Sequence, residues 1–423
     1  MAKKNVFDLM EENNSYQKTK DFMRKQQKPY AFKKAYAEKV AWEFYNHPKI
    51  AGQCYVAVGG LDSITLFVFL RSIGIDVPAV SVSSLEDKSI QAVHRALGVE
   101  ALPAVTDEKG KPYTKMRVIR EFGYPVISKE VAQKIQHIQN PTEKNATVRH
   151  AIMTGETGEY GGYRKNSRMK MALKWLKLFG GPENEKEGTD YQTAPIKVSD
   201  RCCYYLKERP CDDYAKRTRR APYMGLMASE GGRRQKALMW HGCNYVSKST
   251  RRSAPFAIFS RQDLLRLALE MDAWYHEHWQ EFGETEIESI IPSVYGEIEK
   301  TELTPEQVRT AEHFIDVVVS QPDADVDDTR ENLRDDLLFP RLRTTKAQRT
   351  GCSMCGFGIH IEKRPHRFDL LWQRNPKEWD LWMHHIEQDE NGQWVGWDRV
   401  LDYIGVEWRN PEQFFGGEHD DLC

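Results

Sequence analysis

Two groups of cysteines have the residue types and spacing of a metal centre. The run RTGCSMCGFGIH (349–360) holds Cys352 and Cys355 in a Cys-x-x-Cys spacing among glycines. Such a turn lets two thiolates face one metal centre, and its glycines expose backbone N–H groups to the sulfur atoms. The spacing fits zinc, an iron–sulfur cluster or a redox pair, and a four-ligand site needs two further thiols. The candidates for those thiols are Cys202, Cys203 and Cys243.

The run VGGLDS (58–63) is the second candidate site. It follows a short apolar run and precedes a helical pattern, which is the order of a strand, a tight turn and a helix. The N–H groups at the start of such a helix bind anions, and Gly59 and Gly60 let the backbone approach a phosphate. Asp62 or Ser63 is suited to cap the helix. Neither the Walker motif nor the dinucleotide motif fits, so an ordinary turn without a ligand is the alternative.

Alternating strand and helix patterns surround this loop. Apolar runs predict strands at 55–58, 77–82 and 99–105, and helical periodicity predicts helices at 63–73 and 87–98. Strands that alternate with helices form a parallel sheet with right-handed crossovers. The sequence therefore predicts an α/β fold with a Rossmann-like parallel sheet and a mostly helical C-terminal part. Cys54, at the start of the first strand, is expected to pack in the core.

Composition suggests three segments along the chain. Residues 1–48 have the pattern of an N-terminal helical segment, and residues 49–260 hold the nucleotide-binding α/β domain. An insertion near 130–195 is polar, and we predict that it is rich in loops. Residues 261–423 are predicted to be mostly helical and to carry the Cys-x-x-Cys motif.

The overall composition indicates a globular protein. The chain has 423 residues, of which 40% are hydrophobic, and this is enough for a core. Its net charge of -1 gives no global signal of nucleic-acid binding. The apolar run at 64–70 is too short to span a bilayer, and no signal peptide is recognisable. We expect a cytoplasmic protein with reduced cysteines and no membrane partner. The sequence does not determine the oligomeric state.

Longer motifs resemble a known family. Three segments, SDRCCYYLKERPCDDYAK (199–216), APYMGLMASEGGRRQKALMWHGCNY (221–245) and RTGCSMCGFGIHIEKRPHRFDLLWQRNPKEW (349–379), follow one another. Their order is similar to that of the phosphoadenosine phosphosulfate (PAPS) reductase family, especially its longer phage and mobile-element members. The resemblance runs from about residue 30 to residue 385. VGGLDS likewise resembles the PP-loop, Ser-Gly-Gly-x-Asp-Ser, of ATP pyrophosphatases and sulfonucleotide reductases.

The resemblance implies two sets of site residues. The family binds an adenine nucleotide (PAPS, adenylylsulfate (APS) or ATP), and many members hold a [4Fe-4S] cluster through a Cys-Cys pair and a distant Cys-x-x-Cys. The longer relatives add a Gly-Cys-Asn segment, which Cys243 matches here. Cys243 and Cys202 are therefore alternative candidates for the same metal-ligand position. The expected metal ligands are Cys203, Cys243, Cys352 and Cys355, with Cys202 as the alternative to Cys243 and zinc as the alternative metal. The expected nucleotide-binding residues are Gly59, Gly60, Asp62, Ser63, Lys207, Gly225 and Arg234.

Three departures from the family bear on function. Val58 and Gly231 stand where the family has serine hydroxyls near the phosphates. The family's C-terminal Glu-Cys-Gly-Leu/Ile-His motif, which carries the nucleophilic cysteine, does not occur in this sequence. Cys423 is the remaining candidate nucleophile, and the alternative is that it is merely the end of the chain.

We therefore expect a PAPS reductase-like enzyme that carries out sulfur chemistry with a thiol or sulfur donor protein. An ATP-dependent sulfurtransferase that acts on nucleic acid is one alternative. A non-catalytic, zinc-stabilised module with a degenerate loop is the other.

Overall fold

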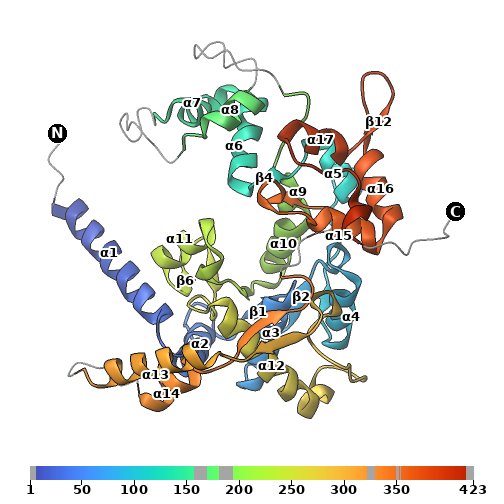
Figure 1. The fold of residues 1–423 in the computed structure, drawn as a ribbon. Helices are drawn as coiled ribbons and strands as arrows, with labels where there is room; N and C mark the ends of the chain where they lie inside the picture. The colour runs from blue at the N-terminus through green and yellow to red at the C-terminus, as the bar shows by residue number, and fades with distance from the viewer. Residues whose placement is uncertain are drawn as a thin grey trace. The chain divides into compact units, whose positions relative to one another are not determined.

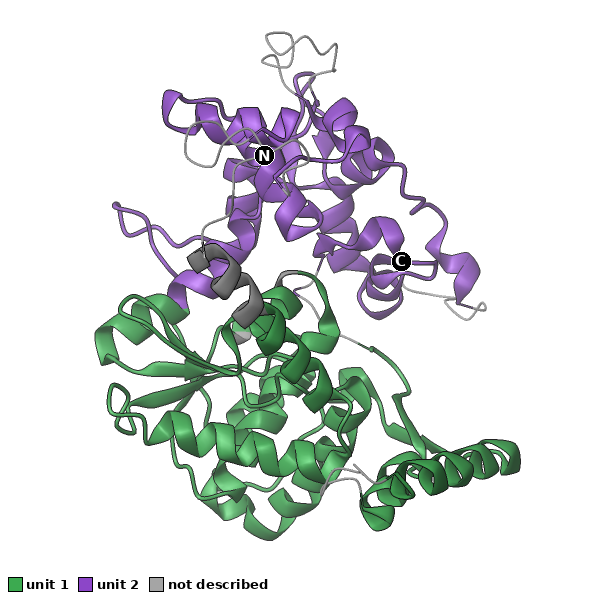
Figure 2. Cartoon of the chain, turned by 90° about the vertical axis from the view of Figure 1, so that its left-hand side faces the viewer, with its two compact units in different colours: residues 1–103, 211–350 green, residues 104–210, 351–423 purple. Residues whose placement is uncertain are grey.

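The chain forms two compact units (Figure 2). Unit 1 comprises residues 1–103 and 211–350, and unit 2 comprises residues 104–210 and 351–423. The computed structural model describes residues 6–156, 169–180, 194–321, 329–348, 352 and 354–415. Each unit is therefore built from two segments that are distant in sequence.

A mixed six-stranded sheet forms the centre of unit 1 (Figure 1). Its order is β3-β2-β1-β5-β7-β6, and every neighbouring pair is parallel except β6 and β7. The strands are β1 (Cys54–Ala57), β2 (Ala79–Ser81), β3 (Glu100–Ala101), β5 (Ala221–Tyr223), β6 (Asn244–Val246) and β7 (Arg251–Ser253). This α/β architecture is compatible with a Rossmann-like fold, which confirms the predicted fold class at that level.

The first strand and the helix after it are the best-buried part of unit 1. In β1, Cys54 and Val56 are fully buried, as expected for a strand that is covered on both faces. Helix α3 (Leu61–Ser72) is buried from Leu61 to Leu70 except for Asp62, and it packs against α12 (Arg261–His278). The predicted strand–turn–helix at 55–73 is therefore present, with boundaries shifted by one or two residues.

Other helices and a hairpin complete unit 1. The helices are α1 (Val6–Gln26), α2 (Tyr30–Tyr45), α4 (Lys88–Ala96), α10 (Arg209–Thr218), which begins in the last residues of unit 2, α11 (Gly232–His241), α13 (Pro305–Val319) and α14 (Arg330–Leu337). Strands β8 (Ile298–Thr301) and β9 (Arg341–Thr344) pair antiparallel. Helices α1 and α2 occupy the segment that the sequence predicts to be helical.

Unit 2 is mostly helical around a separate core. Its helices are α5 (Lys115–Phe122), α6 (Lys129–Gln139), α7 (Ala146–Thr154), α8 (Leu173–Phe179), α9 (Arg201–Cys203), α15 (Arg367–Arg374), α16 (Pro376–His384) and α17 (Trp397–Ile404). Two short pairs of strands accompany them: β4 (Val126–Ile127) with β10 (Gly356–Phe357), and β11 (Glu387–Gln388) with β12 (Trp394–Val395). Phe179 from the first segment and Trp397 from the second are fully buried in this one core.

The units divide the chain differently from the three predicted segments. The expected boundaries after residues 48 and 260 both fall inside unit 1, and the Cys-x-x-Cys motif belongs with residues 104–210. The insertion near 130–195, predicted to be rich in loops, contributes helices α6, α7 and α8, and its residues 157–168 and 181–193 lie outside the described part of the chain. Its apolar residues are few and widely spaced, and Ala132, Ile135 and Ile138 of α6 lie three positions apart on one buried face. Low apolar content therefore concealed amphipathic helices.

No helix in the described part of the chain is both long and apolar enough to cross a membrane. Every cysteine that the structure describes is a free thiol.

Candidate functional site

Four cysteines come together in unit 2, and we call them the cysteine quartet. Cys202 and Cys203 belong to α9, and Cys352 and Cys355 lie in the loop that precedes β10. Both cysteines of α9 are close enough to both loop cysteines to interact with them electrostatically. The quartet therefore unites the two cysteine motifs of the sequence within one unit.

A helical backbone lets the adjacent pair face the same side. Consecutive residues of a helix point about 100° apart, whereas in an extended strand they point to opposite faces. Cys202 and Cys203 have helical geometry, and the next five residues form the π-helical turn η5 (Tyr204–Glu208). Single π-turns are rare and are frequent at functional sites. The helical backbone therefore allows both cysteines to serve one centre.

Close packing fixes the loop that carries the other pair. The N–H group of Cys355 donates to the carbonyl oxygen of Cys352 at 3.1 Å, and Met354 between them has a left-handed φ of 52°. A Cβ atom on Gly356 would lie 2.5 Å from the ring of Trp397, so only glycine fits there. The following residue, Phe357, pairs with Ile127 of β4. The loop is therefore anchored to the core of unit 2 directly after Cys355.

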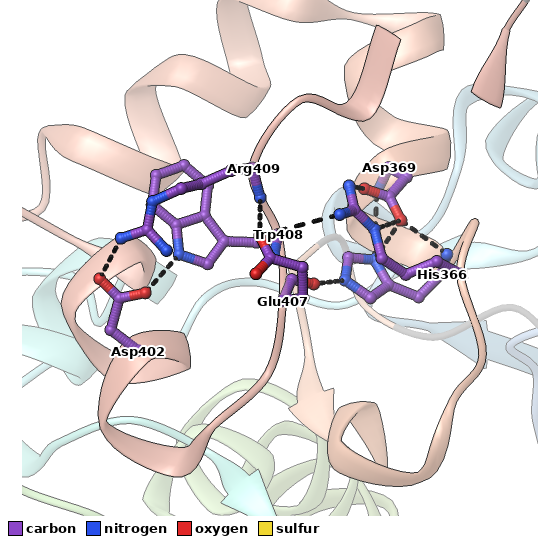
Figure 3. Close-up of polar contacts among 7 residues, drawn as sticks. His366, Asp369, Asp402, Glu407, Trp408 and Arg409 are labelled. Atoms are coloured by element: carbon purple, nitrogen blue, oxygen red, sulfur yellow. Dashed lines mark hydrogen bonds and ion pairs between the residues drawn. The ribbon is translucent and has the colours of Figure 1, made fainter. Parts of the chain in front are cut away.

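A buried polar network holds the segment that follows this loop (Figure 3). His366 caps α15, because its Nδ1 accepts from the N–H group of Asp369 while the Asp369 carboxylate accepts from the N–H group of His366. The His366 Nε2 donates to the carbonyl oxygen of Glu407 at 3.1 Å, and Arg364 donates to the Asp369 carboxylate at 2.8 Å. Trp408 joins the same region through a hydrogen bond to Asp402. These groups satisfy one another, so we assign them a structural role.

Burial keeps the thiols of α9 protonated when no metal is bound. It raises the pKa of Cys202 and of Cys203 to about 12 in each case. The positive charge of Lys115 opposes this rise at Cys202, and that of Lys129 opposes it at Cys203. Metals bind thiolates, so metal loading would release these protons.

Four thiolates can hold either of two kinds of metal centre. Among the described residues, no three His, Cys, Asp or Glu side chains are grouped closely enough to hold one metal ion. In a zinc site the four sulfurs would lie about 3.8 Å apart, since each is about 2.3 Å from the ion in tetrahedral geometry. In a [4Fe-4S] cluster each thiolate binds its own iron, and the sulfurs are spread more widely.

Cys243 has a different environment. It is buried in the core of unit 1, its thiol is hydrogen-bonded to Tyr36, and burial raises its pKa to about 11. The structure therefore joins Cys202, and not Cys243, to Cys203 and the Cys-x-x-Cys pair. Cys54 packs in the same core as Cys243, as the sequence predicts. The candidate nucleophile Cys423 lies outside the described residues.

The loop at residues 58–63 lies at the carboxyl end of β1. This is the point where the strand order reverses, since β2 and β3 lie on one side of β1 and β5 lies on the other. Ligands of open α/β sheets bind at such a switch point. Gly225, just after β5, touches the loop so closely that a Cβ there would lie 2.9 Å from the backbone of Asp62. The structure thus brings Gly225 to the loop, as expected.

Side chains of unit 1 already occupy two of the loop's amide groups. The N–H group of Gly59 donates to the Ser63 hydroxyl at 2.7 Å, and that of Leu61 donates to the Tyr295 hydroxyl at 3.1 Å. Burial lowers the pKa of His94, whose neutral ring donates from Nε2 to the carbonyl oxygen of Gly59 at 2.8 Å. Tyr295 and His94 could not be predicted as neighbours of the loop, because no local motif links them to it.

Val58 faces the core rather than the mouth of the loop. Its side chain is only 5% exposed, and it packs among the apolar residues of unit 1. Its N–H group donates to the carbonyl oxygen of Val80 in the adjacent strand. A serine hydroxyl at this position would therefore meet apolar neighbours.

The other expected phosphate contacts are dispersed. Arg234 donates to both carboxylate oxygens of Glu230 at 2.6 Å, and Asp62 pairs with Arg261 at 3.0 Å. Gly231 has a positive φ of 74° and open space around it. Lys207 belongs to unit 2, within the π-turn after the cysteine pair.

No protein-family model, curated protein or solved structure gives a significant match to this chain. The arguments for its function therefore rest on its own residues.

Proposed function

We propose that this chain binds a [4Fe-4S] cluster through the cysteine quartet and an adenine nucleotide at the loop of residues 58–63. We further propose that it uses both in sulfur chemistry of the PAPS reductase-like kind. The observation that carries the proposal is the meeting of the Cys-Cys and Cys-x-x-Cys motifs in one part of unit 2. The strand order and the position of the glycine loop support the finer assignment to the PP-loop fold.

In this proposal unit 2 carries the cluster ligands and unit 1 carries the nucleotide-binding loop. Cys202, Cys203, Cys352 and Cys355 would hold the cluster, which supplies one-electron chemistry when bound. The amide groups at the start of α3 would face the phosphates, and the helix dipole favours their negative charge. A thiol or sulfur donor protein completes the reaction. The family's nucleophile motif is missing, so two reactions stay open. Either the thiols of the donor protein supply electrons that reduce a sulfonucleotide, or sulfur passes from the donor protein to a nucleic acid.

Anaerobic purification followed by metal and sulfide analysis tests the cluster. We expect iron and acid-labile sulfide in equal amounts and the broad visible absorbance of an iron–sulfur protein. Calorimetric titration with ATP, APS and PAPS then tests the nucleotide and ranks the substrates. Protein that holds neither metal nor nucleotide would refute the proposal.

The contacts of the loop favour a second candidate, a non-catalytic, metal-stabilised module. Ser63 and Tyr295 occupy amide groups that a phosphate would need, and Val58 lies in the core where the family has a hydroxyl. In this interpretation the loop is a structural turn and no nucleotide binds.

Removal of one hydroxyl separates the two candidates. In Tyr295→Phe, the N–H group of Leu61 becomes free for a phosphate, so an active loop should bind ATP up to about tenfold more tightly. Tyr275→Phe is the matched control, since the Tyr275 hydroxyl also accepts from a backbone N–H group, that of Ile287, away from the loop. If neither the wild-type protein nor Tyr295→Phe binds any nucleotide, the non-catalytic module is favoured.

A further inference from the structure

Lys115 is a buried lysine of unit 2 without a hydrogen-bond partner among the described residues. It is the first residue of α5, just after the N-cap Thr114, it is only 9% exposed, and its Nζ makes no hydrogen bond to any residue that the structure describes. The ring of Trp382 lies 4.8 Å from Nζ and offers a cation–π contact. A buried ammonium group needs a compensating charge, so an unpaired lysine here requires an explanation.

The charges that face Lys115 come mainly from the cysteine quartet. Helix α5 packs against α9, and Lys115 interacts electrostatically with Cys202, then Cys352 and Cys355, in decreasing order. Glu378 of α16 is the carboxylate that also acts on it, more weakly than these three cysteines. That carboxylate also accepts a hydrogen bond from Asn375 at 3.1 Å. The strongest partner available to the lysine is therefore a cysteine of the quartet, which becomes a thiolate when a metal binds.

We propose that Lys115 is the built-in counter-charge of the metal centre, a positioning residue that retains the cluster and raises its reduction potential. This rests on the proposed function, because it assumes that the quartet holds a cluster. Four thiolates leave such a cluster negatively charged, and each added electron increases that charge. A positive charge fixed beside it in an apolar place stabilises the bound cluster and, more strongly, its reduced form.

Lys115→Met keeps the size and apolar stem of the side chain and removes the charge. Lys115→Arg restores the charge, and Lys129→Met is the matched control. Lys129 also acts on one cysteine of the quartet, Cys203, but it is partly exposed and paired with Glu208. Each full-length variant is purified anaerobically, and iron, sulfide and the reduction potential are measured by a redox titration followed by electron paramagnetic resonance. Urea unfolding of chelator-treated protein gives the stability of the metal-free state.

The loss of the Lys115 charge should weaken the cluster-loaded protein and stabilise the metal-free protein. Lys115→Met should retain the cluster about 10–100-fold less well during chelator challenge, and its potential should be more negative than that of the wild type. The metal-free variant should be more stable than the metal-free wild type, because an unpaired buried cation is gone. A residue with a merely structural role would lower the stability of both states. Lys115→Arg should regain much of the potential, and Lys129→Met should differ little from the wild type.

The outcomes separate the inference from the proposed function. If the wild type loads a cluster and Lys115→Met matches it in retention and potential, the inference is overturned and the proposed function stands. If the wild type loads no cluster even after reconstitution with iron and sulfide, the proposed function and the inference both fall.

Discussion

The two candidate sites of this protein are built in different ways. The cysteine quartet of unit 2 joins side chains from two distant segments, and a shared core that includes Trp397 and Phe179 holds those segments together. The loop of unit 1 is local, since one strand, one turn and one helix supply all of it. Beside the quartet, Nζ of Lys115 has no hydrogen-bond partner among the described residues, whereas two amide groups of the loop have protein partners.

The two sites differ in whether their buried polar groups already have hydrogen-bond partners within the protein. Buried groups without partners indicate that a further component is expected, because orphaned buried polar atoms are rare in native proteins. Both units contain such atoms among their described residues, for example the hydroxyls of Thr65 and Ser81 in unit 1. Beside the quartet the orphaned atom is Nζ of Lys115, which a negative charge would satisfy. Unit 1 can accept a phosphate only by displacing the Tyr295 hydroxyl or by using the amide groups that remain. Four predictions test this contrast, beginning with the largest effect.

Replacement of Cys202 should have the largest effect, which is a loss of metal affinity. Cys202→Ser removes a member of the quartet, so its metal affinity should fall on the order of 100-fold or more. Cys243→Ser is the matched control, because Cys243 lies in the core of unit 1 beside Tyr36. Iron analysis after anaerobic purification measures both. If Cys243→Ser loses its metal and Cys202→Ser keeps it, our assignment of the quartet is wrong.

Alkaline pH should destabilise the metal-free protein specifically. The folded state raises the pKa of Cys202 and Cys203 from 9.0 to about 12, so above pH 9 the unfolded chain releases these protons first. The free energy of unfolding should therefore fall as the pH rises from 9 toward 12, by about 1.4 kcal/mol per pH unit for each thiol. Metal-loaded protein has no such protons to lose and should show a shallower slope. Urea unfolding at several pH values measures both slopes, and equal slopes would count against buried, protonated thiols.

Gly356→Ala should damage unit 2 through a steric clash. The new Cβ would meet the ring of Trp397 at 2.5 Å, and overpacking of this kind costs about 1–3 kcal/mol. A second change, Trp397→Phe, shortens the ring and should recover part of the loss, so the two changes should be coupled. Urea unfolding of the two single variants and the double variant measures that coupling. Strict additivity would show that the two residues do not compete for space.

Val58→Ser should have the smallest effect and the most informative sign. The hydroxyl would enter an apolar site, so the variant should be about 1–2 kcal/mol less stable than the Val58→Ala control. It should gain no affinity for ATP. The family resemblance alone would predict about tenfold tighter binding from one additional hydrogen bond to a charged oxygen. Calorimetry that shows such a gain over Val58→Ala would mean that position 58 faces the ligand after all.

The sequence determined the local chemistry of this protein. Alternating patterns predicted the strand, turn and helix around Gly59 and Gly60, and the strand β2 that lies parallel to β1, but not its other parallel neighbour, β5. The spacing of Cys352 and Cys355 among glycines predicted a tight turn, and adjacent cysteines can serve one centre only from a helical or kinked backbone, which α9 supplies. These features depend on residues a few positions apart, and their geometry follows from backbone conformation.

Only the tertiary structure decided which distant groups meet. It brought Cys202, and not Cys243, close to the Cys-x-x-Cys pair, and it placed Lys115 near these cysteines. It also buried Val58 in the core of unit 1 and brought Tyr295 to the loop. It also combined residues 104–210 with residues 351–423 in one unit. The physical reason is that hydrophobic packing is non-directional and pairs any apolar faces that fit. Spacing along the chain can therefore show that a helix has a buried face, but not which segment covers it.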